Sequence, residues 1–448
     1  MKKFTSIHDR ILWREIVIIS AVLFVQLLGG IVTAFTFVAL SIWALRSPKH
    51  AIQALFLSWF ITLLNPSIFI EYEGKEIFRW LVLFAAFSQV SISKIIHKSR
   101  MPREIIYLAF FLFFVASVSM LKSYAPIVSL FKLIIFAVGV STVLLAFELI
   151  ENQKAYWRSW VTTFFLWILI LGFPLYFSEF GYARNGKGFQ GLLNHPQAYA
   201  VFLAPMVVWF TGRFLFDKNK SVPIVIGVVL GWFSLFSTLS RTGVLAAILG
   251  CGLMIIIGIK KKVVWRNTQA YTSGNHIGVT GLCLLCIFLV LSWAPLSKHM
   301  RTFLLKERES FNNAYYLSKR RVTIERSINN FLDNPLTGIG FGIASDPFMF
   351  IVRKDKWLGL PIGASIEKVF LPTAILEEVG ILGTLLLLAF VFGVIRPLLN
   401  WGNLVALCLF ITSLLVNMGE MIFFSFGGMG LYIWLMIGFS RILRERKV

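Results

Sequence analysis

The chain has 448 residues, of which 58% are hydrophobic and only 14% are charged, and its formal net charge is +22 at pH 7. Soluble domains carry about 25% charged residues, so this composition excludes a soluble globular protein and indicates a polytopic membrane protein. In such a chain the excess of positive charge first concerns how loops are sorted across the bilayer, and we expect no nucleic-acid partner.

Fourteen apolar runs reach or approach the roughly 20 residues that cross a bilayer as a helix, and none alternates like the strands of a membrane barrel. The first run follows Met1, Lys2 and Lys3, but the apolar stretch is too long for a cleaved signal peptide, so we expect it to be retained. The sequence therefore predicts an all-α polytopic membrane protein with about 12–14 transmembrane helices. The predicted spans are 16–28, 31–45, 51–69, 78–96, 104–122, 127–149, 157–177, 196–215, 222–238, 243–259, 276–294, 371–393, 402–418 and 421–440.

These spans divide the chain into three parts. Residues 1–295 hold about eleven helices with short loops, residues 296–371 form one long extracytoplasmic loop, and residues 372–448 hold the last helices and a basic tail. Lys and Arg mark one set of connections, whereas the alternate set, 71–76, 123–126, 178–194 and 239–242, is poorer in positive charge. The positive-inside rule therefore predicts that both termini are cytoplasmic.

The cysteines do not predict a metal site. Cys251, Cys283, Cys286 and Cys408 all lie in apolar runs. Cys283 and Cys286 form a CxxC, but the second pair or the histidines of a zinc site are absent. We expect core packing, no metal and no other cofactor.

The long loop is the most hydrophilic part of the chain. It holds twelve Lys or Arg against seven Asp or Glu, and because long loops translocate largely regardless of charge, this excess suggests an anionic ligand. Within the loop, the spacing of Leu317, Ile324, Ile328 and Phe331 predicts an amphipathic helix over 314–332, with Arg320, Arg321 and Arg326 available to a ligand. We expect this helix to lie on the membrane surface as a lid, with its apolar stripe inward.

Two of the short outside connections each hold an arginine at the membrane rim. Residues 181–196 (GYARNGKGFQGLLNHP) place Arg184 and Lys187 among glycines, and residues 235–243 (LFSTLSRTG) place Arg241 between two apolar helices. Arginine grips phosphate with a fixed fork of donors, and glycines let backbone amides approach the same anion. Each arginine could instead snorkel to lipid headgroups.

These motifs, in order, resemble the signature of the bacterial O-antigen ligase and polymerase superfamily. The resemblance rests on Arg184-Asn185-Gly186, Asn194-His195-Pro196, Ser240-Arg241, Asn334-Pro335-Leu336 with the following glycines, and Leu376-Glu377-Glu378-Val379-Gly380-Ile381-Leu382-Gly383. It covers roughly residues 180–390.

The resemblance implies a GT-C-like membrane glycosyltransferase of the bacterial cytoplasmic membrane, acting at its outer face. Such an enzyme takes a glycan from a polyprenyl-diphosphate donor and joins it to a hydroxyl of a glycan or lipid-linked acceptor. Arg184 and Arg241 match the arginines that engage the donor diphosphate, and Glu378 matches the family's glutamate. Fixed positive charges can stabilise the leaving diphosphate without a metal.

One family residue is missing. Ligases carry a histidine eleven residues before the first glycine of the GxxG, and Val369 stands at that position. The nearest group able to accept a proton is Glu367, so we assign it as the candidate catalytic base, with the alternative that it is a loop charge paired to Lys368. His195 is a weaker substrate-binding candidate, placed at a turn before Pro196, and Glu378 could equally cap its helix or form a salt bridge.

Two other functions compete with glycosyl transfer. A transporter or flippase of a lipid-linked or anionic solute predicts charges deep in several spans or paired interrupted helices, but apart from a few polar positions such as Gln26, Gln53 and Asn417 the spans read as clean. A structural scaffold leaves the two rim arginines without a purpose.

Overall fold

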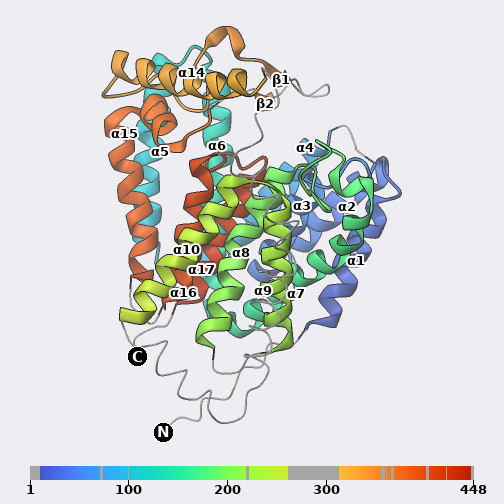
Figure 1. Ribbon diagram of the computed structural model, residues 1–448. Helices are drawn as coiled ribbons and strands as arrows, with labels where there is room; N and C mark the ends of the chain where they lie inside the picture. Colours follow the sequence, from blue (N-terminus) through green and yellow to red (C-terminus); the bar gives the residue numbers. More distant parts are fainter. Residues whose placement is uncertain are drawn as a thin grey trace.

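The computed structural model describes residues 11–70, 74–98, 100–217, 221–260, 312–354, 359, 361–364, 368–399, 403–419 and 421–444. Within these ranges the chain is a helical bundle with one small two-stranded ribbon (Figure 1). The helices are α1 (Trp13–Gln26), α2 (Ile31–Ala44), α3 (Pro48–Thr62), α4 (Lys75–Ile96), α5 (Arg103–Lys122), α6 (Pro126–Leu149), α7 (Lys154–Gly172), α8 (Pro196–Phe216), α9 (Val222–Ser237), α10 (Arg241–Lys260), α14 (Asn312–Asp333), α15 (Leu371–Ile395), α16 (Leu404–Leu415) and α17 (Met429–Ile442). Short 3-10 turns are η1 (Glu151–Gln153), η2 (Phe173–Phe177), η3 (Glu179–Tyr182), η5 (Pro347–Met349), η6 (Arg396–Leu398) and η8 (Val416–Met418).

The all-α polytopic fold is confirmed. Seven helical segments of the described chain are long and apolar enough to cross a membrane, namely 77–96, 103–122, 126–149, 151–177, 196–216, 241–259 and 371–398, and the apolar helices at 31–44, 222–237, 404–418 and 429–442 are shorter. The predicted span 276–294 lies outside the described residues.

Two predicted spans are too long. The span predicted over 51–69 ends at Thr62, because Pro66 biases Asn65 away from helical angles and Asn65 turns into a buried contact instead. The span predicted from residue 421 begins only at Met429, after Gly427 and Gly428.

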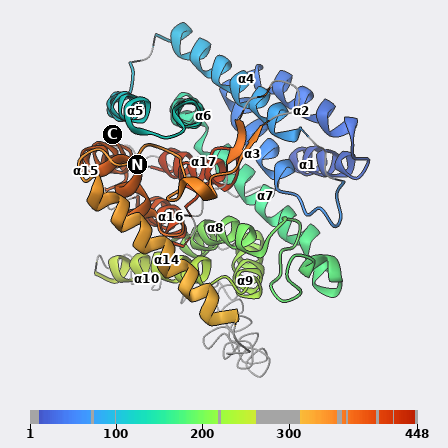
Figure 2. The same ribbon diagram turned by 90° about the horizontal axis from the view of Figure 1, so that it is seen from above.

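The centre of the bundle is aromatic. Trp59 of α3 stacks on Tyr432 of α17 with ring centroids 4.6 Å apart, and on Phe202 of α8 at 5.6 Å. The Tyr432 hydroxyl donates to the Phe202 carbonyl at 2.6 Å, so the polar atom of the Tyr432 side chain has a hydrogen-bond partner. Figure 2 shows α17 in the middle of the bundle, close to α3, α6 and α16.

Charged side chains do occur in the helices, which corrects the prediction of clean spans. Those that form ion pairs between helices lie within about two turns of a helix end. Ion pairs join Lys94 to Glu148 at 2.9 Å, Arg158 and Arg213 to Asp217 at 2.8 and 3.0 Å, Arg444 to Glu151 at 2.8 Å, and Arg441 to Glu104. Pairing at a helix end lowers the cost of placing a charge near lipid, so these charges need no transport pathway to explain them.

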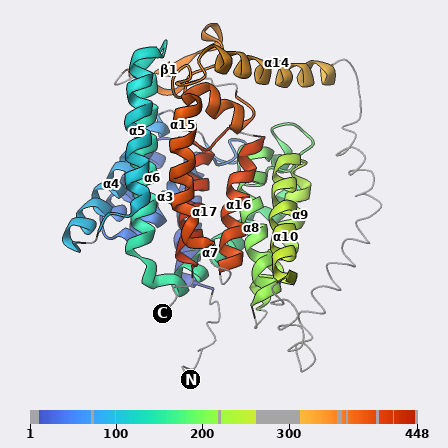
Figure 3. The ribbon, with the colours of Figure 1, turned by 90° about the vertical axis from the view of Figure 1, so that its left-hand side faces the viewer.

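The amphipathic helix predicted over 314–332 is confirmed as α14, Asn312–Asp333. It lies across the upper ends of the other helices, roughly perpendicular to them, and packs on α15 (Figure 3). Beyond it, β1 (Val352–Lys354) and β2 (Pro361–Ala364) pair antiparallel, with Val352 opposite Ala364.

Helix α15 is interrupted at Gly380, whose φ is +63°. The interruption frees backbone groups, and the segment 335–340 binds them: Ile381 N donates to Pro335 O at 2.8 Å and Leu382 N to Leu336 O at 3.2 Å. In return Ile339 N and Gly340 N donate to the carbonyls of Glu377 and Glu378 at 2.9 and 3.1 Å. The two glycine-containing motifs of the sequence are therefore the two halves of one interlocked structure.

We predict that Gly380→Ala destabilises the protein. The left-handed backbone costs a non-glycine residue about 1–3 kcal/mol, and an added Cβ would lie 2.4 Å from the Leu336 carbonyl carbon. The measurement is the thermal unfolding midpoint in detergent micelles. The matched control is Gly252→Ala in α10, where an added Cβ has nothing within 4 Å. Equal midpoints for the two variants would contradict the interlock.

Candidate active site

The connection between α7 and α8 carries Arg184 and is fixed by buried amides. Asn65, fully buried at the end of α3, donates from Nδ2 to the carbonyls of Phe180 and Gly191 at 2.8 and 3.1 Å. Gln190, 1% exposed, accepts the Arg184 backbone N–H at 2.8 Å through Oε1. The backbone of this connection is thus held from inside while the Arg184 side chain stays exposed.

From residue 184 to residue 190, every backbone amide of this connection has a protein partner. Lys187 N and Gly188 N donate to Asn185 Oδ1 at 3.1 and 2.9 Å. The remaining amides from 184 to 190 donate to Gln190, Tyr182, Ser237 or Gly181. The prediction that backbone amides approach an anion is therefore wrong for residues 184–190, where the exposed side chains of Arg184 and Lys187 are the groups available to an anion.

The connection that carries Arg241 packs against the first one. Phe189 N donates to Ser237 O at 2.9 Å, and a Cβ at Gly188 would lie 2.7 Å from Thr238 O, so only glycine permits this approach. Arg241 begins α10 with its side chain exposed. The structure thus brings the two connections together, while convergence of the two guanidinium groups on one diphosphate stays a prediction.

His195 is the N-cap of α8, not a free base. Its Nδ1 accepts the Gln197 N–H at 3.0 Å. Burial lowers the pKa of its imidazole below the usual value, and the positive charge of Arg184 lowers that pKa further. A neutral ring is what the cap requires, because a protonated Nδ1 has no lone pair to accept with.

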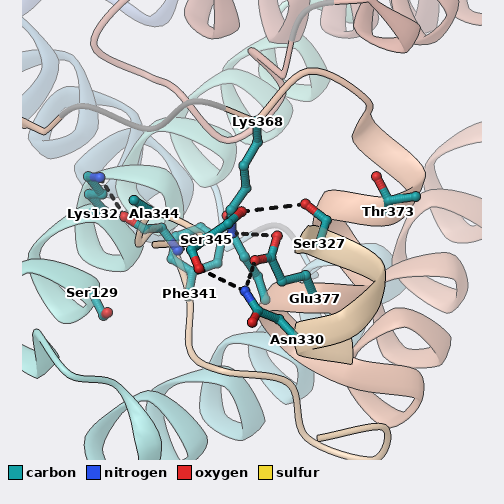
Figure 4. Close-up of polar contacts among 12 residues, drawn as sticks. Ser129, Lys132, Ser327, Asn330, Phe341, Ala344, Ser345, Lys368, Thr373 and Glu377 are labelled. Atoms are coloured by element: carbon teal, nitrogen blue, oxygen red, sulfur yellow. Dashed lines mark hydrogen bonds and ion pairs between the residues drawn. The ribbon is translucent and has the colours of Figure 1, made fainter. Parts of the chain in front are cut away.

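A second cluster lies where α14 meets the start of α15 (Figure 4). Lys368 Nζ lies 2.8 Å from Glu378 Oε1 and 3.3 Å from Glu377 Oε2, and all three side chains have no exposed surface. Glu378 Oε2 accepts Gly342 N at 2.8 Å. The expectation that Glu378 could form a salt bridge is confirmed, and its partner is Lys368.

Glu377 connects the cluster to α14. Its Oε1 accepts from Asn330 Nδ2 of α14 at 2.7 Å, and the same amide donates to Ser345 O at 2.9 Å. On the other side of the cluster, Lys132 of α6 donates from Nζ to Gly342 O at 2.5 Å. Glu377, Asn330 and Lys132 were not predicted from the sequence as contributors to a site. Lys132 is a lone cation inside an apolar run, which is the signal that could have identified it.

The inward face of α14 is more polar than predicted. Ser327 is 2% exposed and Asn330 points inward, whereas Ile328 of the predicted apolar stripe is 41% exposed. Buried carbonyls and carboxylates of the cluster need donors, so polar side chains occupy this face. Of the α14 arginines, Arg326 pairs with Asp346 at 3.1 Å and Arg321 with Glu325 at 2.7 Å, both at the surface.

Several predicted positions remain untested. Glu367 and the side chain of Arg320 lie outside what the structure describes. Lys368, expected as a possible partner of Glu367, has its Nζ on Glu377 and Glu378 instead. Among the described residues, no group of three or more His, Cys, Asp or Glu could hold a metal ion.

A family model matches part of the chain. Residues 226–388 match the model described as O-antigen ligase. This part of the chain is therefore similar to the O-antigen ligase family. This confirms the resemblance to the O-antigen ligase and polymerase superfamily. The matched region includes Arg241, α14 and the Lys368 cluster, whereas Arg184, Lys187 and His195 precede it. A search of curated proteins found no match.

We predict that Lys368→Met strongly destabilises the region that matches the O-antigen ligase model. Removing the cation leaves two buried carboxylates uncompensated, which typically costs about 3–5 kcal/mol. The measurement is the thermal unfolding midpoint in micelles. The control is Arg321→Met, which breaks an ion pair whose side chains are 81% and 52% exposed, so solvent screening leaves the midpoint nearly unchanged. Similar midpoints in the two variants would argue against the cluster as a structural centre.

Proposed function

We propose that this protein is a membrane glycosyltransferase that takes a glycan from a polyprenyl diphosphate, of the undecaprenyl type, and joins it to a sugar hydroxyl at the outer face of the bacterial cytoplasmic membrane. The observation that carries the proposal is the pairing of the two arginine-bearing connections through Phe189 N and Ser237 O at 2.9 Å. Both connections lie on the face covered by α14, and the second lies in the region that matches the O-antigen ligase model.

The diphosphate would be held by arginine side chains. Negative charge on the leaving diphosphate grows as the glycosidic bond breaks, and a fixed cation stabilises that charge more in the transition state than in the ground state. Since the backbone amides near Arg184 are already used, the guanidinium groups of Arg184 and Arg241 and the ammonium of Lys187 are the groups that remain for this role. In this proposal the reaction needs no metal.

Polymerisation, or another polysaccharide-handling reaction, fits the chain better than ligation to lipid A core. The position of the ligase histidine is Val369, and valine can neither accept nor donate a proton. We propose Glu367 as the group that accepts the acceptor hydroxyl's proton.

We also propose that both termini lie in the cytoplasm, as the positive-inside rule predicts.

A transporter is less well supported. Transporters use interrupted helices whose freed carbonyls coordinate ions, and α15 is interrupted at Gly380. Its freed groups are, however, bound by residues 335–340. The interruption thus binds another part of the same chain and leaves these carbonyls already occupied.

We predict that Arg184→Ala and Arg241→Ala each reduce kcat by about 10²–10³-fold, as loss of one transition-state donor does. The double variant should be little worse than either single one, because groups that act as a unit are not additive. Turnover is measured with purified protein and the lipid-linked donor of its own cell. The control is Arg103→Ala. Arg103 is an exposed arginine at the start of α5, whereas the other end of α5, at Lys122, contacts Asn334. Full activity of both single variants would instead support the alternative that these arginines contact lipid headgroups.

We predict that Glu367→Gln lowers kcat by about 10²–10⁴-fold, the usual contribution of a general base, without weakening donor binding. Glutamine keeps the shape of the side chain but loses the basic oxygen. The control is Glu325→Gln, an exposed carboxylate of the same long connection. A turnover equal to wild type across the pH range would remove Glu367 from the reaction.

A further inference from the structure

A cavity of about 320 Å³ lies under the C-terminal end of α14, where this helix meets the end of α5. It is lined by Lys122, Tyr124, Asn330, Asn334, Gly338, Ile339, Ser345 and Pro347. None of the predicted site residues lines it. In the view from above, α14 runs from α15 to beside α9 (Figure 2). Its 22 residues span roughly 33 Å. The cavity lies at the C-terminal end of α14, and the other end lies beside α9, the helix that precedes the Arg241 connection.

The polar groups of the cavity are fixed before any ligand arrives. Lys122 Nζ donates to Asn334 Oδ1 at 3.1 Å, and among the described residues no acceptor takes the two amide N–H groups of Asn334. Asn330 is held by Glu377 and Ser345. Tyr124 donates to Ala344 O at 2.9 Å, and its ring meets Phe350 edge-on at 5.4 Å. Fixed side chains lose little entropy when a ligand binds.

The lining excludes two ligand classes. Phosphate recognition calls for several cations or free backbone amides, whereas one lysine lines the cavity and an amide already occupies it. Burial raises the pKa of Tyr124 to about 12, so the phenol is neutral and adds no charge. A purely apolar ligand would cover the amide of Asn334 without offering it a hydrogen-bond partner, which is unfavourable.

We propose that this cavity binds one sugar unit of a glycan chain, at a distance from the bond that is formed. A sugar presents hydroxyls that both donate and accept, and it has an apolar ring face. Asn334, Ser345 and Lys122 supply the matching donors and acceptors, while Tyr124 and Pro347 supply apolar surface. The inference rests on the proposed function, because it assumes that the bound chain is the glycan being transferred or extended.

Such a subsite makes the enzyme sensitive to glycan length. Only a chain long enough to reach from the arginine connections along α14 gains the extra contacts. The gain comes from binding at a point remote from the reaction, so it lowers KM for long chains and leaves kcat for short chains unchanged.

The first test is direct binding without the diphosphate. The probes are oligosaccharides of increasing length, released by mild acid from the surface polysaccharide of the cells that make this protein, and the full chain is used in micelles. Wild type should bind longer oligosaccharides more tightly. Asn334→Ala and Lys122→Gln, which change the two partners of one hydrogen bond in the cavity lining, should each weaken the long ones by about 10-fold, as loss of one or two hydrogen bonds does. The control is Asn329→Ala, an exposed neighbour outside the cavity.

The second test separates the sources of the chain. Donor and acceptor lengths are varied independently in the transfer assay, and the arm in which Asn334→Ala raises KM identifies the chain that enters the cavity. Binding that is independent of length, or unchanged in both cavity variants, overturns the subsite. A third outcome separates the two proposals. If binding depends on length and both variants weaken it, but the wild-type protein transfers no glycan, the subsite is supported and the proposed function is overturned.

Discussion

The interruption of α15 is the feature on which this region of the structure depends. Gly380 turns the backbone out of the helix and frees groups that the membrane cannot hydrate, so the segment 335–340 must bind them. That segment then places Gly342 on Glu378, and Lys368 compensates both buried glutamates. A buried charge or backbone polar group without a partner would be costly here. These contacts therefore fix α15 to α14 and to the end of the long loop.

The fold could be predicted from the sequence to a large extent, because apolar length and periodicity determine helices in a bilayer. The ends of α14 lie within two residues of the prediction. Errors arose where local chemistry competes with apolarity, as at Asn65-Pro66, where a buried amide replaces the last turns of α3. The polar inner face of α14 could not be foreseen, since Ser327 and Asn330 face inward only because Glu377 and Ser345 lie beneath them.

The candidate site divides in the same way. Arg184 and Arg241 were predictable as rim cations, and their connections do meet. The role of the neighbouring glycines was misjudged. The number of glycines does not tell how many backbone N–H groups can bind a ligand. Here the side-chain oxygens of Asn185 and Gln190 accept several of these N–H groups, through contacts that form only in the folded turn. Glu377 and Glu378 are adjacent in sequence, yet one anchors α14 and the other anchors Gly342. Only their three-dimensional partners distinguish them.

The two polar regions are physically different, and this difference bears on function. The arginine connections present cations to solvent on a rigid backbone, which suits an anion that arrives and leaves. The cluster around Lys368 is sealed, with no exposed side-chain surface on its three charged residues, so it cannot meet a substrate without opening. Between them runs α14, anchored by Asn330 at one end. Under the proposed function, a helix held at its C-terminal end can guide an extended glycan along its length, with the sugar cavity at the anchored end and the diphosphate near the opposite end.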